Sequence, residues 1–219
     1  MFAHSPEIRR RFPALRHRLL LVQGVDRLDP AALDPAHFVA EAMARLTETP
    51  ESALPPIRAW REAFAAMGLK PTQVRSAPEA LLRRLRLQGD LPRLHPLVDF
   101  GNAVSAAHAI PLAIFDLDRL RGTLTVRPAN GTETYDRFDG GQECPDPGEV
   151  IFADEAGIAH ARRWVHRQSA RSAVGPDTRR ALMVAEALHT GAAADLARMI
   201  AALSEGIRMA GGTVTADAA

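Results

Sequence analysis

The chain has 219 residues, of which 47% are hydrophobic and 5% aromatic, and its formal net charge is +1. This length and apolar content predict one substantial core, and the near-neutral charge excludes whole-molecule attraction to a polyanion, so any affinity for nucleic acid must come from local clusters. The few aromatic side chains argue against a surface that stacks many bases along a strand.

Cellular location is indicated by the cysteine count and by the lack of long apolar runs. Cys144 is the single cysteine and has no partner for an internal disulfide, which favours a reducing compartment. The basic start, Met1–Phe12, is not followed by a signal-peptide core, and the apolar run Leu19–Val22 is too short to span a bilayer. We therefore expect a cytoplasmic protein that is not inserted in a membrane.

The first half of the chain is predicted to be mainly helical. Hydrophobic periodicity, caps and breakers place helices and two strands in this order: strand 15–25, helix 34–47, helix 57–67, helix 76–89, helix 96–109 and strand 112–115. Ser76 and Glu79 have the spacing of a capping box at the start of the third of these helices.

The second half is predicted to turn to strands and then back to helices. The expected elements are strands 123–127 and 132–138 as a hairpin around Asn130-Gly131, strands 149–153 and 158–168, and helices 178–188 and 192–209. Residues 211–219 are expected to be a flexible tail. The order predicts an α+β single domain over residues 1–210, with a mixed β-sheet core flanked by N-terminal and C-terminal helices.

Motifs for nucleotide, zinc and serine-hydrolase chemistry are absent from the sequence, so we expect no cofactor and no metal. Three polar residues stand in apolar surroundings instead. Asp99 and Asn102 are three residues apart and share a face of a predicted helix, and Asp116 ends a predicted strand. Such groups either line a site or find partners as caps.

Arginines gather in two places. On a strand over 158–168, Arg162, Trp164, His166 and Gln168 point one way and Arg163, Val165 and Arg167 the other. Such a density of donors suits an anion, although charged strands also serve as solvated edges. The basic helix face with Arg83 and Arg84 is either solvated or an RNA contact.

Motifs in the middle of the chain resemble the tRNA-editing domain in the β subunit of bacterial phenylalanyl-tRNA synthetase. They are Val98-Asp99-Phe100-Gly101-Asn102-Ala103-Val104, Pro111-Leu112-Ala113-Ile114-Phe115-Asp116-Leu117, Gly131-Thr132-Glu133 with Phe138-Asp139-Gly140, and Glu149 to Gly157. The core of the resemblance spans residues 91–178. Flanking motifs, such as Gly68-Leu69-Lys70-Pro71 and Arg167-Gln168-Ser169, are similar to those of free-standing relatives of that domain.

The resemblance implies a trans-acting hydrolase that deacylates mischarged tRNA by water attack on the aminoacyl ester. It assigns Asn102 to the attacking water or the ester carbonyl. Substrate-binding roles are expected for Asp99, Asp116, Glu149, Arg163 and Gln168, and contact with tRNA for Arg83, Arg84 and Arg167. Ala113 stands where the synthetase domain has a histidine, so the terminal ribose hydroxyl is expected to supply the proton transfer.

Two other functions stay open at this stage. A pocket that has lost its histidine at Ala113 could bind the aminoacylated acceptor end of tRNA, or an amino acid, without catalysis. The chain could also dock onto another protein through its helical ends. The amino acid, the tRNA and the oligomeric state do not follow from the sequence.

Overall fold

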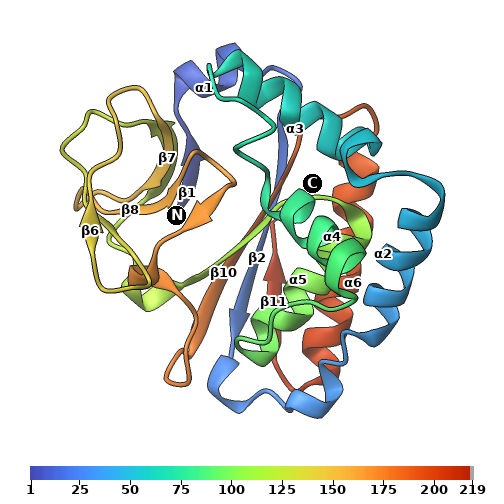
Figure 1. Ribbon diagram of the computed structural model, residues 1–219. Coiled ribbons are helices and arrows are strands. Elements are labelled where there is room, and N and C mark those ends of the chain that lie inside the picture. The colour runs from blue at the N-terminus through green and yellow to red at the C-terminus, as the bar shows by residue number, and fades with distance from the viewer. Residues whose placement is uncertain (218–219) are drawn as a thin grey trace.

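The computed structural model describes residues 1–217 (Figure 1). The α-helices are α1 (Pro6–Arg11), α2 (Ala36–Glu48), α3 (Pro55–Ala66), α4 (Ala77–Gln88), α5 (Pro96–His108) and α6 (Ala192–Met209). The strands are β1 (Phe2–His4), β2 (Arg16–Gln23), β3 (Leu112–Asp116), β4 (Leu124–Pro128), β5 (Tyr135–Asp136), β6 (Gln142–Glu143), β7 (Val150–Ala153), β8 (Ala159–Arg162), β9 (Arg167–Gln168), β10 (Arg180–Ala187) and β11 (Thr213–Ala216).

Two sheets organise the fold. The central sheet has the strand order β11-β2-β10-β3, and all its neighbouring strands are antiparallel. The second sheet has the order β1-β4-β7-β8-β9, in which β1 and β4 are parallel and the other pairs antiparallel. In Figure 1 the second sheet lies to the left of the central sheet, and most of the helices lie to the right of the central sheet.

The central sheet is covered on both faces. Ala181 and Met183 of β10 belong to a core formed with α5 and α6, whereas Leu182 and Val184 belong to a core formed with the second sheet. Successive residues of a strand point to opposite faces, so β10 is buried on both sides. The molecule thus has three layers in the order helices, central sheet, second sheet.

Helices α2, α3 and α4 form an annex next to α5. Their small core contains Ala42 of α2, Ile57 of α3, Leu82 and Leu85 of α4, and Ala106 of α5. Each of these helices contributes apolar residues to this core, and the helix over 57–67 was predicted from such an apolar stripe. The annex carries α4, whose first residues reach the space between the two sheets.

The predicted α+β class is confirmed, and so are all the predicted elements of the first half and some of the second. Confirmed elements are the strand over 15–25, the helices over 34–47, 57–67, 76–89, 96–109 and 192–209, and the strands over 112–115, 123–127 and 149–153. Among residues 1–217, no helix is both long and apolar enough to cross a membrane.

The prediction of a helix over 178–188 is wrong, because this segment contains β10. Its Ala, Leu and Met residues have high helix propensity. Seven of the eight residues of β10 are buried, however, since the strand lies between two other layers. A strand buried on both faces has no polar alternation, and its sequence cannot be told from a buried helix by periodicity alone.

The predicted hairpin around Asn130-Gly131 is also wrong, because β4 pairs with β1 and β7, and β5 pairs with β6. The carboxylate of Glu133 accepts hydrogen bonds from the main-chain N–H groups of Asn130 and Gly131, at 3.1 Å each. It also accepts one from the guanidinium of Arg127. These bonds close the loop on itself, so its N–H groups need no partner strand.

The prediction of one strand over 158–168 is wrong as well. The chain reverses after β8 and returns as β9, which pairs antiparallel with β8. Arg163 and Trp164 adopt left-handed backbone conformations at the reversal, with φ of 49° and 59°. The Trp164 ring is fully buried, and its burial compensates for a conformation that non-glycine residues rarely adopt. Side chains of this segment therefore do not alternate between two faces.

Two smaller predictions also differ from the structure. Ser76 does precede α4, but its hydroxyl makes no capping hydrogen bond, and Glu79 instead forms an ion pair with Arg61 at 2.6 Å. The expected flexible tail contains β11, which pairs with β2. Residues 218–219, the last part of that predicted tail, lie outside the described residues.

Candidate functional site

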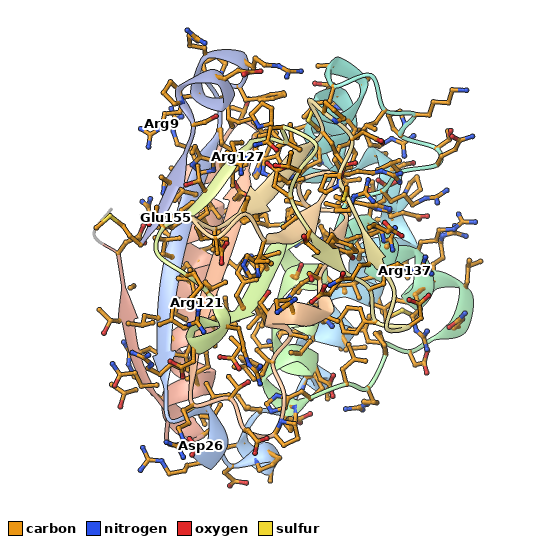
Figure 2. All side chains as sticks on the ribbon, turned by 90° about the vertical axis from the view of Figure 1, so that its left-hand side faces the viewer. Arg9, Asp26, Arg121, Arg127, Arg137 and Glu155 are labelled. Atoms are coloured by element: carbon orange, nitrogen blue, oxygen red, sulfur yellow. The ribbon has the colours of Figure 1, made fainter. Side chains whose placement is uncertain are left out.

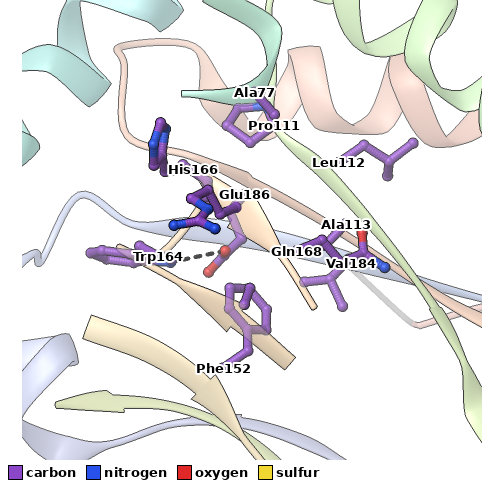
Figure 3. A pocket seen from close by; sticks show the side chains of 13 residues that line it. Ala77, Pro111, Leu112, Ala113, Phe152, Trp164, His166, Gln168, Val184 and Glu186 are labelled. Atoms are coloured by element: carbon purple, nitrogen blue, oxygen red, sulfur yellow. Dashed lines mark hydrogen bonds between the residues drawn. The ribbon is translucent and has the colours of Figure 1, made fainter. Parts of the chain in front are cut away.

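A pocket lies between the two sheets, beside their edge strands β3 and β9 (Figure 3). Its walls come from β3, β7, β8, β9, β10, the turn between β8 and β9, and the first turn of α4. Leu112, Ala113, Phe152 and Val184 make much of the lining apolar. Apolar pockets that contain a few fixed polar groups are the usual form of small-molecule sites, which typically enclose about 300–1,000 Å³. The cavity volume here is about 60 Å³, so a ligand as large as an amino acid requires the walls to move apart.

The most deeply buried polar group of the pocket is Glu186 of β10, which is 1% exposed. One carboxylate oxygen bonds the Nε2 atom of His4 at 2.6 Å, and the other accepts from the indole Nε1 of Trp164 at 2.9 Å (Figure 3). A buried carboxylate without donors would be strongly destabilising. The two donors hold this one in place, and its remaining lone pairs can accept further hydrogen bonds.

Gln168 lines the pocket from β9 and joins the two edge strands. Its side-chain amide nitrogen donates to the main-chain carbonyl of Ile114 in β3 at 2.7 Å. Its own main-chain carbonyl accepts from the hydroxyl of Tyr135 at 2.8 Å. The main chain and the side-chain amide nitrogen of Gln168 are thus both held by hydrogen bonds. Its amide oxygen makes no hydrogen bond within residues 1–217.

His166 lines the same pocket with an imidazole of defined tautomer. Its Nδ1 atom lies 2.7 Å from the main-chain carbonyl oxygen of Arg75. A carbonyl only accepts, so Nδ1 carries the proton. Burial lowers the pKa of His166, helped by the charges of Arg163 and Arg167 and opposed by the bond to Arg75 and by Glu149. The ring is therefore neutral near pH 7, with a lone pair on Nε2.

Comparison with known families places these features in context. Residues 59–206 match the B3/4 domain family. The chain belongs to this family.

The B3/4 domain protein is similar in sequence to phenylalanine–tRNA ligase β subunits. The relative from Tropheryma whipplei is 30% identical over 129 residues, covering 59% of this chain and 13% of the relative. The one from Bradyrhizobium diazoefficiens is 38% identical over 82 residues, covering 37% and 10%. The chain thus spans only about an eighth or a tenth of these relatives, and the expected relationship to their β subunit is confirmed.

The fold of the B3/4 domain protein is also found in a solved structure. It resembles an N-terminal fragment of the phenylalanyl-tRNA synthetase β subunit from Pyrococcus horikoshii, with a TM-score of 0.54. The match covers 98% of this chain and 50% of that fragment at 8% sequence identity, so the likeness is one of fold.

In this B3/4 domain, two of the predicted site residues line the pocket, whereas Glu149 and Arg163 do not. Gln168 and Arg167 are in the lining. Glu149 accepts from Arg162 Nε at 2.9 Å and from the main-chain N–H of Arg163 at 3.0 Å. These bonds hold the reversal between β8 and β9. The carboxylate of Glu149 therefore supports the turn and is already engaged by hydrogen bonds.

Asp99, Asn102 and Asp116 do not come together in a common hollow. Asp99 accepts from the main-chain N–H of Leu94 at 2.8 Å and faces a different surface hollow. Asp116 accepts from the hydroxyl of Thr178 at 2.8 Å and from the N–H of Asp118. Asn102 lies on α5, in the helical layer across the central sheet from the pocket, and does not line it.

The arginines predicted to contact tRNA lie in two places. Arg83 and Arg84 are on α4, where Arg83 is 3.8 Å from Glu51 and Arg84 is 3.1 Å from Asp90. Arg167 lies beside the pocket, with its guanidinium 5.5 Å from the centre of the Tyr135 ring. Acidic neighbours thus partly neutralise the basic face of α4.

Sequence reasoning missed Glu186 and His4. Glu186 was hidden by the prediction of a helix over its segment. The signal that it carries is a lone acid within the otherwise apolar residues 181–187, since a buried acid requires partners. His4 has no such signal, because its partner is 182 residues away in the chain.

Proposed function

We propose that this B3/4 domain protein is a trans-acting aminoacyl-tRNA deacylase whose pocket between the two sheets receives the esterified amino acid. One observation carries the proposal: in a chain of this family, a pocket with apolar walls surrounds a buried, hydrogen-bonded carboxylate, Glu186. An amino acid joined to tRNA has a side chain and a positively charged α-ammonium group. The apolar walls of the pocket suit the side chain, and the carboxylate of Glu186 suits the ammonium group.

Recognition depends on charge and on fixed acceptors. Glu186 supplies negative charge in a region of low polarity, where attraction to an ammonium group is stronger than in water. The amide oxygen of Gln168 adds a neutral acceptor beside it. Leu112, Ala113 and Val184 contact the side chain of the amino acid.

Hydrolysis needs a water molecule and a group that accepts its proton. His166 lines the same pocket as Ala113 and presents Nε2 as a free base. Water oxygen attacks the ester carbonyl carbon while Nε2 takes a proton from the water. The ester C–O bond then breaks, and the ribose oxygen receives that proton. The products are a free amino acid and uncharged tRNA.

This mechanism differs from the one expected from the resemblance. There, Asn102 holds the water and the terminal ribose hydroxyl moves the proton. Asn102 does not line the pocket, so it is not placed to hold the water there. His166 does line the pocket, and we assign the proton transfer to its Nε2 in place of the ribose hydroxyl. The role of Asn102 stays a prediction. Full deacylation activity of Asn102→Ala would contradict that role.

The test is a deacylation assay with a panel of tRNAs charged with different amino acids. We expect the wild-type protein to release amino acid with multiple turnovers from at least one member. His166→Asn should lower the rate about 10²- to 10⁴-fold. His37→Asn, a change at an exposed histidine of α2, serves as the matched control and should keep full activity. Absence of turnover on every ester would contradict the proposal.

A second function, binding without catalysis, is favoured by one observation. Ala113 occupies the position at which the resemblance expects a histidine. A binder would show a ligand-dependent rise in Tm with a stable aminoacyl-adenosine amide and no turnover of esters. The two functions are therefore separated by the same panel.

A further inference from the structure

A second hollow adjoins the pocket on its outer side. It is lined by Tyr135, Arg137, Phe138, Asp139, Arg167 and Gln168. Arg167 and Gln168 line both this hollow and the pocket that contains Glu186. The hollow and the pocket are therefore immediate neighbours, with Arg167 and Gln168 at their common border.

Phe138 presents an aromatic ring to solvent in this hollow. Its side chain is 72% exposed, and it is the one aromatic residue among the large hydrophobic residues that are exposed within 1–217. Isolated exposed hydrophobic residues are common on protein surfaces, so exposure alone carries no function. Its position beside the pocket is what distinguishes Phe138 from the exposed leucines and methionines.

The loop that carries Phe138 has a fixed shape. It joins β5 to β6, and the main-chain N–H of Arg137 donates to the carbonyl of Gly141 at 2.8 Å. The carboxylate of Asp139 accepts from the N–H of Gly141 at 3.1 Å and pairs with Arg137. The backbone of the loop is therefore ordered, and binding a ligand does not require the loop to be ordered first.

Two arginines, Arg137 and Arg167, line the same hollow as Phe138. Arg167 lies 5.5 Å from the centre of the Tyr135 ring and 3.7 Å from Glu143, and Arg137 is 3.3 Å from the same carboxylate. Aromatic rings and guanidinium planes are the groups on which single-stranded RNA bases stack. Arginine also pairs with phosphate.

We propose that Phe138, together with the guanidinium of Arg167, binds the terminal nucleobase of the RNA whose aminoacyl ester occupies the pocket. The inference rests on the proposed function, and it adds a binding site for the nucleotide to the site for the amino acid. The ester is attached to the ribose of the terminal nucleotide, so its base must lie next to the pocket. The hollow that contains Phe138 borders the pocket at Arg167 and Gln168, which line both.

Binding of an RNA without an amino acid tests this site separately from hydrolysis. The probe is a short RNA hairpin with a single-stranded 3′ end that terminates in adenosine, compared with the same RNA whose last nucleotide is abasic. Phe138→Ala should weaken binding of the complete RNA about tenfold. The abasic RNA should bind wild type and Phe138→Ala equally, because the stacking partner is already missing.

Leu94→Ala is the matched control, since Leu94 is 71% exposed but lies outside the hollow. It should bind both RNAs as the wild type does, and Phe138→Trp should retain tight binding of the complete RNA. Equal affinity of Phe138→Ala and wild type for the complete RNA would overturn the inference. So would an equal loss with both RNAs.

The outcomes also separate this inference from the proposed function. If base-dependent binding through Phe138 is found while no ester is hydrolysed, the nucleobase site stands and the deacylase proposal fails. If esters are hydrolysed and Phe138→Ala binds both RNAs as the wild type does, the deacylase proposal stands and the nucleobase site fails.

Discussion

His166 combines two properties that a proton acceptor needs. The carbonyl of Arg75 fixes the proton on Nδ1, and burial keeps the ring neutral by lowering its pKa. A base that is oriented by a third group is the arrangement found in many hydrolases. The neighbouring residue Arg167 adds a positive charge that disfavours the protonated ring.

The pH dependence of deacylation follows from this pKa. Because the pKa of His166 is lowered, the ring stays neutral to a lower pH than a free histidine, whose pKa is about 6.5. Activity should therefore rise with pH through a midpoint below about 6.5 and stay high at neutral pH. Rates of single-turnover deacylation between about pH 4.5 and 8 measure this midpoint.

The His166→Asn variant provides the control for this profile. Its residual rate should not show the same inflection, because the titrating group is gone. A wild-type midpoint above 6.5, or an inflection that persists in His166→Asn, would exclude His166 as the base.

The reversal between β8 and β9 is the element that shapes the pocket. It turns the chain back at Arg163 and Trp164, buries the Trp164 ring and places His166 and Gln168 in the lining. Left-handed conformations at two non-glycine residues are costly, by about 1–3 kcal/mol each. Glu149 offsets part of this cost through its bonds to Arg162 and to the N–H of Arg163.

Glu149→Gln tests whether this carboxylate supports the turn or contacts substrate. Glu149 and Arg162 are both largely buried, and Arg162 keeps its second partner, Glu143. Removal of the negative charge of Glu149 should therefore lower the free energy of unfolding by about 2 kcal/mol. Denaturant unfolding measures the change, with exposed Glu41→Gln as the control. Unchanged stability together with weaker substrate binding would instead favour the role predicted from the resemblance.

At the scale of the whole molecule, three layers give different parts of the chain different stability. β10 lies in the middle of the central sheet, between β2 and β3, and is covered on both faces. β11 is an edge strand with three of four residues exposed. Segments with little burial open locally, whereas a central strand is released only when the core unfolds.

Amide hydrogen exchange should show this difference directly. The N–H groups of β10 should exchange more than about 100-fold slower than those of β11, because β11 can detach from β2 without disrupting the core. Exchange followed by mass spectrometry or NMR measures both. Equal rates would mean that β11 unfolds only together with the central sheet, contrary to this expectation.

The pocket itself is a product of the layered assembly. Glu186 comes from the central sheet and Trp164 from the reversal in the second sheet, while His4 comes from the first strand of the chain. Figure 2 shows how side chains fill the molecule on the side of the second sheet, where Arg127 and Arg137 are labelled. Few of these contacts join residues that are close in sequence.

The sequence by itself determined the α+β class, the helices α2 to α6 and the strands β2, β3, β4 and β7, because caps and apolar periodicity act between residues a few positions apart. It also carried the resemblance that the family match confirms. Only the tertiary structure decided that residues 180–187 form a central strand, that Arg163 and Trp164 reverse the chain, and that Glu186 meets His4. Strand pairing and buried polar contacts join distant residues, and local patterns do not encode which distant partner a residue will find.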